Sequence, residues 1–165
     1  MKMRLTAIAS AALLLTALVA AQNKGDTGKR TPEASDDAVR DTLQRLYAAW
    51  SDLDPAKAAP FYAKDATCVF FDIAPMKYTS WSEYAAGVPK AFAPYKSGKF
   101  TLSDDLRVNR QGKLAWATGT WRGDLVKKAG GSEHMEGRYT AVLEKRGKEW
   151  VVVHEHMSVP APPSD

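Results

Sequence analysis

The hydrophobic pattern changes from a helical to a strand period along the chain. Between residues 39 and 53 apolar side chains recur every three or four positions, which predicts an amphipathic helix that begins near Ser35. Asp54-Pro55 would end that helix and start a short second one. Ser80 and Glu83 have the spacing of a capping box and predict a third helix. Its apolar side would carry Trp81, Tyr84, Val88 and Phe92.

The remaining apolar segments are typical of strands. Residues 67–71 are β-branched and aromatic, and from residue 99 onward the period becomes two. We therefore expect a strand at 67–71 and four more at 100–108, 114–126, 133–144 and 150–159. Glycine-containing turns separate the last four. This order predicts an α+β fold with the helices packed on one face of a curved antiparallel sheet.

Alternation along the last two strands predicts which side chains face the helices. In residues 133–144 the odd-numbered positions, Tyr139 among them, form the more apolar face. In residues 150–159 the predicted inward set is Val151, Val153, Glu155, Met157 and Val159. The predicted outward set is Trp150, Val152, His154, His156 and Ser158. The pattern alone does not orient the strand at 114–126.

The two ends of the chain predict segments outside the domain. Lys2 and Arg4 precede an apolar run, and Val19-Ala20-Ala21 has the small residues of a cleavage site. We expect residues 1–21 to be the signal peptide of an exported protein, which would be periplasmic or secreted. The protein would contact the membrane only transiently, through this peptide. A retained membrane anchor is the alternative. Residues 22–34 predict a flexible linker, residues 35–159 the domain, and residues 160–165 a proline-rich tail.

Composition narrows the function classes. The 165 residues are 45% hydrophobic and 25% charged, as in a globular domain with a core. Removal of residues 1–21 takes away two basic residues, Lys2 and Arg4, and no acidic one, so the formal net charge of +4 falls to +2. That weak charge argues against nucleic-acid binding. The single cysteine, Cys68, excludes an intrachain disulfide. Phosphate-binding and nucleophile motifs are absent from the sequence, and we expect no cofactor.

Three segments resemble the SnoaL-like branch of the nuclear transport factor 2-like superfamily. Residues 61–67 (FYAKDAT) are similar to a segment of ketosteroid isomerases, and residues 115–121 (AWATGTW) form the second segment. The third comprises residues 137–142 and residues 153–158 (VHEHMS), and it resembles the association domain of calcium/calmodulin-dependent kinases. The resemblance covers residues 39–159 and implies a cone-shaped sheet with three N-terminal helices on its concave face.

The resemblance also implies residue roles. The aspartate that serves as general base in the isomerases matches Phe70 here, and their oxyanion-hole aspartate matches Ala141, so neither carboxylate is kept. Their oxyanion-hole tyrosine matches Tyr47. Trp116 and Thr118 are implied to face inward. A homodimer through the outer face of the sheet is implied as well.

Two acidic residues are candidate general bases, because a carboxylate in an apolar cleft has a raised pKa. Asp72 lies on the same strand face as Phe70, with a solvated loop acid as the alternative. Glu155 lies on the inward face of the last strand, with a structural carboxylate as the alternative. Tyr47 or Tyr139 would donate a hydrogen bond to the substrate. We expect Glu155 either to accept a hydrogen bond from Tyr139 or to be protonated.

A pocket for a flat, apolar ligand would have aromatic walls. The candidates are Trp50, Phe61, Phe70, Trp81, Trp116, Thr118, Tyr139 and Met157. A filled core is the alternative for the same residues.

The spacing His154-x-His156 is compatible with zinc. We expect instead no metal and a polar network on the outer face of the sheet. Its members would be Arg138, Thr140, His154, His156 and Ser158.

Three functions remain open from the sequence. The first is binding of a small apolar or aromatic molecule without chemistry. The second is a cofactor-independent isomerase, dehydratase or cyclase that uses Asp72 or Glu155. The third is an oligomerisation or interaction module.

Overall fold

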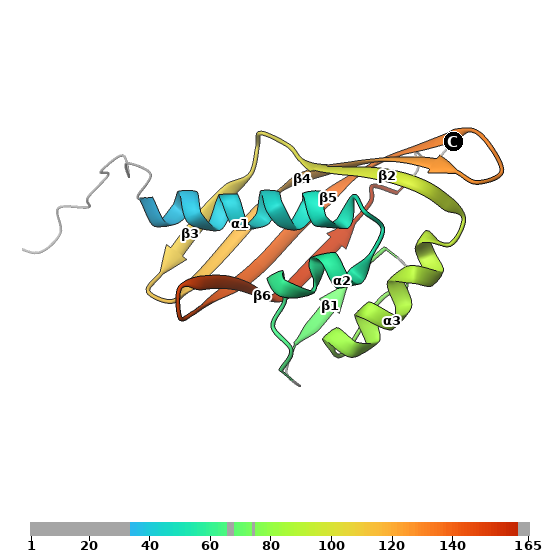
Figure 1. Cartoon of the computed structure of the whole chain (residues 1–165). Helices are drawn as coiled ribbons and strands as arrows, with labels where there is room; N and C mark the ends of the chain where they lie inside the picture. Colours follow the sequence, from blue (N-terminus) through green and yellow to red (C-terminus); the bar gives the residue numbers. More distant parts are fainter. Residues whose placement is uncertain (1–33, 66–67, 74, 162–165) are drawn as a thin grey trace, which may run out of the picture. The chain divides into compact units, whose positions relative to one another are not determined.

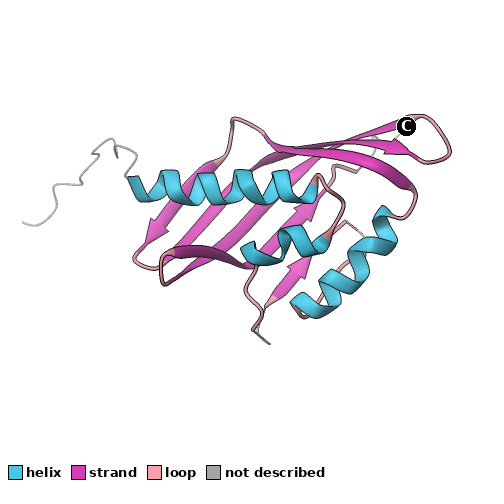
Figure 2. Cartoon of the chain, viewed as in Figure 1, coloured by secondary structure: helices cyan, strands magenta, loops and turns pink. Residues whose placement is uncertain are grey.

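The computed structural model describes residues 34–65, 68–73 and 75–161, which form a mixed α+β unit (Figures 1 and 2). The expected signal peptide, and the linker up to residue 33, lie outside the described residues. The helical segments are α1 (Ala34–Trp50), α2 (Pro55–Ala58), the short 3-10 helix η1 (Ala59–Phe61) and α3 (Trp81–Phe92). The strands are β1 (Val69–Phe71), β2 (Tyr95–Leu102), β3 (Arg107–Gln111), β4 (Leu114–Lys127), β5 (Ser132–Arg146) and β6 (Glu149–Ser158).

The helices begin where their capping residues predict. The Asp54 carboxylate accepts a hydrogen bond from Ala56 N at 2.8 Å, and the Ser80 hydroxyl accepts one from Glu83 N at 3.1 Å. Val39, Leu43 and Leu46 of α1 are fully buried, because their helical spacing places them on the side of α1 that packs against the sheet. In the part of the chain that the structure describes, no helix has the length and apolar character to cross a membrane.

The sheet has the strand order β1-β6-β5-β4-β2, and β3 also pairs with β4. Pairing is antiparallel throughout, as predicted, except that β1 runs parallel to β6. The sheet is curved and open, and α1 lies across one face of it (Figure 1). Glu155 lies on an interior strand, because it pairs with Phe70 of β1 on one side and with Ala141 of β5 on the other.

The predicted strand at 100–108 is two strands. β2 pairs with residues 121–127 of β4, β3 pairs with residues 114–118, and a turn at Asp104-Asp105 separates them. The Asp105 carboxylate accepts a hydrogen bond from Thr120 N at 2.9 Å, so that amide stays satisfied where the ladder is interrupted. The turn also lets Leu106 enter the core.

The predicted faces of the last strand are wrong in its first half. The β5–β6 register shifts at a bulge, where Leu143 pairs with Val152 but Val142 pairs with His154. One extra residue, Val153, reverses the alternation at this point. Trp150 and Val152 are therefore buried in the core on the same face as Glu155, and Val151 and Val153 are not on the predicted inward face.

The implied inward orientation of Trp116 and Thr118 is also wrong. Both side chains are exposed, Trp116 to 42%. The register pairs Ala117 with Ala141 and Gly119 with Tyr139, and directly paired residues share a face of the sheet. The inward residues of β4 are therefore the odd-numbered ones, Ala115, Ala117, Gly119, Trp121, Gly123 and Leu125.

Candidate functional site

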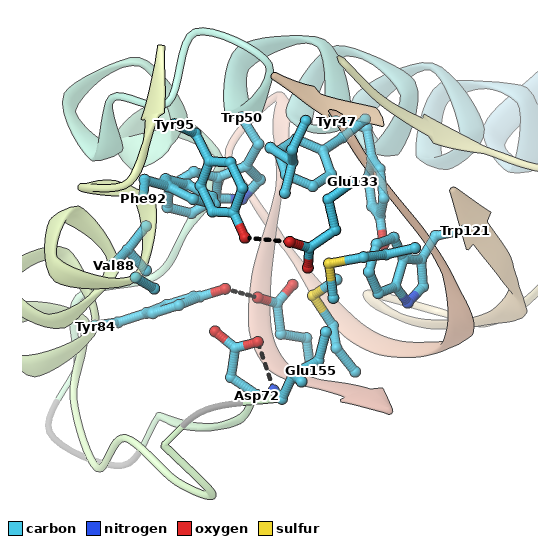
Figure 3. A pocket seen from close by; sticks show the side chains of 16 residues that line it. Tyr47, Trp50, Asp72, Tyr84, Val88, Phe92, Tyr95, Trp121, Glu133 and Glu155 are labelled. Atoms are coloured by element: carbon cyan, nitrogen blue, oxygen red, sulfur yellow. Dashed lines mark hydrogen bonds between the residues drawn. The ribbon is translucent and has the colours of Figure 1, made fainter. Parts of the chain in front are cut away.

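A cavity of about 320 Å³ lies between α1, α3 and the concave side of the sheet (Figure 3). Its walls are mainly apolar and aromatic. The lining residues are Tyr47, Trp50, Asp72, Ile73, Tyr84, Val88, Ala91, Phe92, Tyr95, Phe100, Trp121, Leu125, Glu133, Met135, Glu155 and Met157. The helices contribute through the apolar side that their spacing predicts, and β4, β5 and β6 contribute through inward positions.

Glu155 is a fully buried carboxylate that accepts hydrogen bonds from three tyrosines. Tyr62 and Tyr84 each donate to Oε1 at 2.8 Å, and Tyr139 donates to Oε2 at 3.2 Å. The predicted Tyr139–Glu155 hydrogen bond is thus confirmed. A carboxylate has about four lone-pair positions. Three of them are used, so the fourth, on Oε2, is available to a proton or a ligand.

The surroundings of Glu155 bring the pKa of its carboxyl group close to neutral pH. Burial raises the pKa of Glu155 to about 7, the negative charge of Asp72 acts in the same direction, and the tyrosine hydrogen bonds oppose both. Burial and the Glu155 charge raise the pKa values of Tyr62, Tyr84 and Tyr139 well above the ordinary value, so their hydroxyls stay protonated and act as donors. Near neutral pH the site therefore holds both acid and base forms of one carboxyl group.

Asp72 is the second carboxylate of the cavity. It directly follows β1, its Oδ1 accepts a hydrogen bond from Ile73 N at 2.7 Å, and burial raises its pKa. Figure 3 shows its carboxylate on the same side of the cavity as Glu155 and Tyr84. Asp72 is therefore not a fully solvated loop acid.

Tyr47 of α1 also lines the cavity. Its ring packs edge-on against Tyr139 with centroids 5.2 Å apart. Its hydroxyl is buried and has no hydrogen-bond partner among the described residues. A buried hydroxyl without a partner is unfavourable, so a ligand atom at this position would gain a hydrogen bond.

The predicted pocket residues divide into three groups. Trp50 and Met157 line the cavity, as do the three predicted catalytic residues. Phe61, Phe70, Trp81 and Tyr139 pack behind the wall as part of the core. Trp116 and Thr118 lie on the opposite face of the sheet, as described above.

Tyr62 and Tyr84 are the residues that sequence reasoning missed. Tyr62 bonds Glu155 from the end of η1, and its hydroxyl accepts a hydrogen bond from Trp50 Nε1 at 2.9 Å. Tyr84 was on the predicted apolar side of α3, so helical spacing could have identified it. No local signal connects Tyr62 with a strand 93 residues later in the sequence.

The five residues of the expected polar network lie on the outer face, but their side chains form no network. In the described ranges no side-chain hydrogen bond joins any two of them. His154 Nδ1 lies 2.7 Å from Val69 O, and the two histidine rings pack against Phe71 with centroids 5.5 and 5.7 Å away. The parallel pairing of β1 with β6 provides these alternative contacts. No cluster of three potential metal ligands occurs in the residues described.

Comparison with known proteins gives a family match and many structural matches. A family model described as a SnoaL-like domain matches residues 39–162. No curated protein sequence matches the chain. An NTF2-like protein of unknown function from Pseudomonas putida KT2440 is similar at 27% identity and a TM-score of 0.63, with 77% of this chain and 87% of that chain covered.

Two further structures are similar in fold. A candidate calcium/calmodulin-dependent protein kinase II association domain from Xanthomonas campestris has 25% identity and a TM-score of 0.63, over 75% of this chain and 84% of that one. A candidate dehydratase of the NTF2-like family from Streptomyces avermitilis has 17% identity and a TM-score of 0.69, over 80% of this chain and 100% of that one.

Proposed function

We propose that this chain, which belongs to the SnoaL-like domain family, binds a small, largely apolar or aromatic molecule. The fold of that family does not by itself specify a function, so the proposal rests on the cavity. The observation that carries this proposal is the buried carboxyl group of Glu155 in a cavity of about 320 Å³ with aromatic walls. That volume is at the lower end of the range for ligand pockets. An apolar wall with a few polar groups at one end is the usual composition of such a pocket.

The polar groups define how a ligand would be oriented. The open position on Glu155 Oε2, the Asp72 carboxylate and the Tyr47 hydroxyl can each bond a polar atom of the ligand. The rings of Trp50, Tyr84 and Phe92 would cover its apolar part.

Ligand binding can be tested by tryptophan fluorescence, because Trp50 and Trp121 line the cavity. We expect 2-phenylethanol to change the emission in a saturable way. Ala91→Trp should abolish saturation, because Ala91 lines the cavity and is exposed, so a larger side chain can obstruct the cavity without disturbing the core. Ala86→Trp is the matched control, since Ala86 is an exposed residue of the same helix that does not line the cavity. Equal binding by both variants would contradict the proposal.

A second candidate function is general acid/base catalysis by Glu155, and its pKa of about 7 favours it. A group that titrates near the working pH is suited to take a proton from carbon and return it. The test is deuterium incorporation next to the carbonyl of 2-tetralone in D₂O, followed by NMR. We expect Glu155→Gln to abolish the exchange above the solvent rate. If Asp72→Asn abolishes it and Glu155→Gln does not, Asp72 is the base; if neither variant matters, catalysis by these groups is excluded.

Two further proposals concern the oligomeric state and the cellular location of the protein. We propose that the outer face of the sheet forms a homodimer interface, because Leu114 and Trp116 are 52% and 42% exposed there and apolar surface favours association. We propose that the protein is exported, on the basis of the N-terminal sequence.

A further inference from the structure

The charged residues that line the cavity are all acidic. They are Asp72, Glu133 and Glu155, and the described lining contains no lysine, arginine or histidine. Lys127 Nζ lies 2.8 Å from Glu133 Oε2 and balances that carboxylate. Asp72 and Glu155 have no ion-pair partner within the described ranges. The cavity therefore contains two carboxylates without a compensating cation.

Neutral groups donate the hydrogen bonds that these two carboxylates accept. Three tyrosine hydroxyls donate to Glu155, and a backbone amide donates to Asp72. The titratable groups that face Glu155 are Tyr62, Tyr84 and Tyr139 by hydrogen bonds and Asp72 by its charge. Tyr47 of α1 also faces it, since burial and the Glu155 charge together raise the pKa of Tyr47. Each carboxylate makes ionisation of the other less favourable, because like charges repel strongly in an apolar cavity. A positive charge between them would relieve that repulsion.

Two independent features of the cavity also fit a cation. The Tyr47 hydroxyl is buried without a partner and can accept a hydrogen bond from an N–H donor. The walls contain seven aromatic side chains, and an aromatic face attracts a cation through its quadrupole. They are Tyr47, Trp50, Tyr84, Phe92, Tyr95, Phe100 and Trp121.

We propose that the cavity selects small organic monocations, namely protonated primary amines that carry an aromatic or branched apolar group. The ammonium donates to Glu155 Oε2 and to Asp72, the Tyr47 hydroxyl accepts its third hydrogen, and the apolar group lies against Trp50 and Phe92. This assignment of the ligand class rests on the small-molecule binding proposed above.

Proton release follows from this arrangement. Before binding near pH 7, part of the Glu155 population is protonated, since its pKa is about 7. An ammonium next to the carboxylate favours its charged form, so binding expels that proton to solvent. A neutral ligand has no such effect.

The test compares three probes of similar shape by isothermal titration calorimetry at pH 8. They are 2-phenylethylammonium, the neutral 2-phenylethanol and the anion phenylacetate. We expect the amine to bind at least tenfold tighter than the alcohol and the anion to bind most weakly. Repetition at pH 7 in two buffers of different ionisation enthalpy should show net proton release on amine binding.

The variant Asp72→Asn/Glu155→Gln should remove the preference for the amine and keep binding of the alcohol. Asp104→Asn/Glu149→Gln is the matched control for net charge, because both are exposed residues outside the cavity lining. It should keep the preference. If the double variant does not fold, proton release in the wild-type protein decides, and zero release or uptake overturns the inference.

The outcomes separate the inference from the function on which it rests. If the alcohol binds and the amine binds no more tightly, selection of cations is wrong while small-molecule binding stands. If none of the three probes binds, both are wrong.

Discussion

The Tyr62 hydroxyl donates a 2.8 Å hydrogen bond to Oε1 of Glu155, a residue 93 positions later in the chain. Tyr62 follows η1, and Glu155 lies on β6, an interior strand of the sheet, so this bond ties the helical layer to the carboxylate of the cavity. Tyr62 also makes a second hydrogen bond, since Trp50 Nε1 donates to its hydroxyl oxygen. Removal of any member would leave a buried polar atom without its partner, which is more costly than the bond itself is stabilising.

Glu155→Gln should change how stability depends on pH. The pKa of Glu155 is about 7 in the folded state against an ordinary value of 4.5, so the folded protein retains this proton more strongly than the unfolded chain. The stabilisation that this stronger proton binding gives the folded state is fully present below about pH 4.5 and is lost as the pH rises through about 7. The loss amounts to about 3 kcal/mol. Glutamine keeps the shape without the titration.

Urea unfolding of the wild type and of Glu155→Gln at intervals from pH 4 to pH 8.5 measures this effect. The two proteins differ only at residue 155, so the difference between the two curves isolates Glu155. We expect the variant to gain about 3 kcal/mol relative to the wild type across the range. Parallel curves would contradict a perturbed Glu155.

Tyr84→Phe should lower stability at pH 8 by about 1–2 kcal/mol, because it removes one donor from ionised Glu155. It should also raise the pKa of Glu155, since the tyrosine hydrogen bonds lower that pKa. Tyr62→Phe should be more destabilising, because it also leaves Trp50 Nε1 without its acceptor. The pKa can be followed by ¹³C NMR of the glutamate carboxyl carbons.

Tyr78→Phe is the matched control for these two variants. The Tyr78 hydroxyl is buried and has no partner in the described part of the protein, so its removal should not lower stability. If Tyr78→Phe destabilises as much as Tyr84→Phe, the tyrosine–glutamate hydrogen bonds are not the cause of the loss.

Trp116→Glu should convert a dimer into a monomer, because it places a charge in the exposed apolar part of the outer face. Sedimentation velocity measures the change, and circular dichroism checks that the fold is retained. Met76→Glu is the control, since Met76 is 83% exposed in the loop before α3 and lies outside that face. A wild-type protein that is monomeric at high micromolar concentration would exclude this interface.

Expression in an exporting host should produce a protein that begins near Gln22, because the residues before it have the pattern of a cleaved signal peptide. Mass spectrometry of the soluble fraction identifies the first residue. Ala21→Asp is a useful companion variant, since an acidic residue at the cleavage position should block processing. Intact Met1 in the soluble wild-type protein would refute cleavage.

Local sequence signals predicted most elements of the fold correctly. The spacing of Val39, Leu43 and Leu46 and the capping residues Asp54 and Ser80 depend only on neighbours within one or two turns. The inward position of Glu155 also followed from alternation, because the second half of β6 pairs regularly with β5. The SnoaL-like resemblance was likewise present in the sequence, and the family match confirms it.

The remaining features depended on pairings between distant segments. The bulge at Val153 and the inward face of β4 are set by register with β5, which no local period specifies. The three tyrosines around Glu155 come from the end of η1, from α3 and from β5, and only packing of the helices on the sheet brings them together. The sequence by itself determined the types of element and an inward carboxylate. The tertiary structure decided the environment of that carboxylate, because burial and hydrogen bonding depend on residues far apart in the chain.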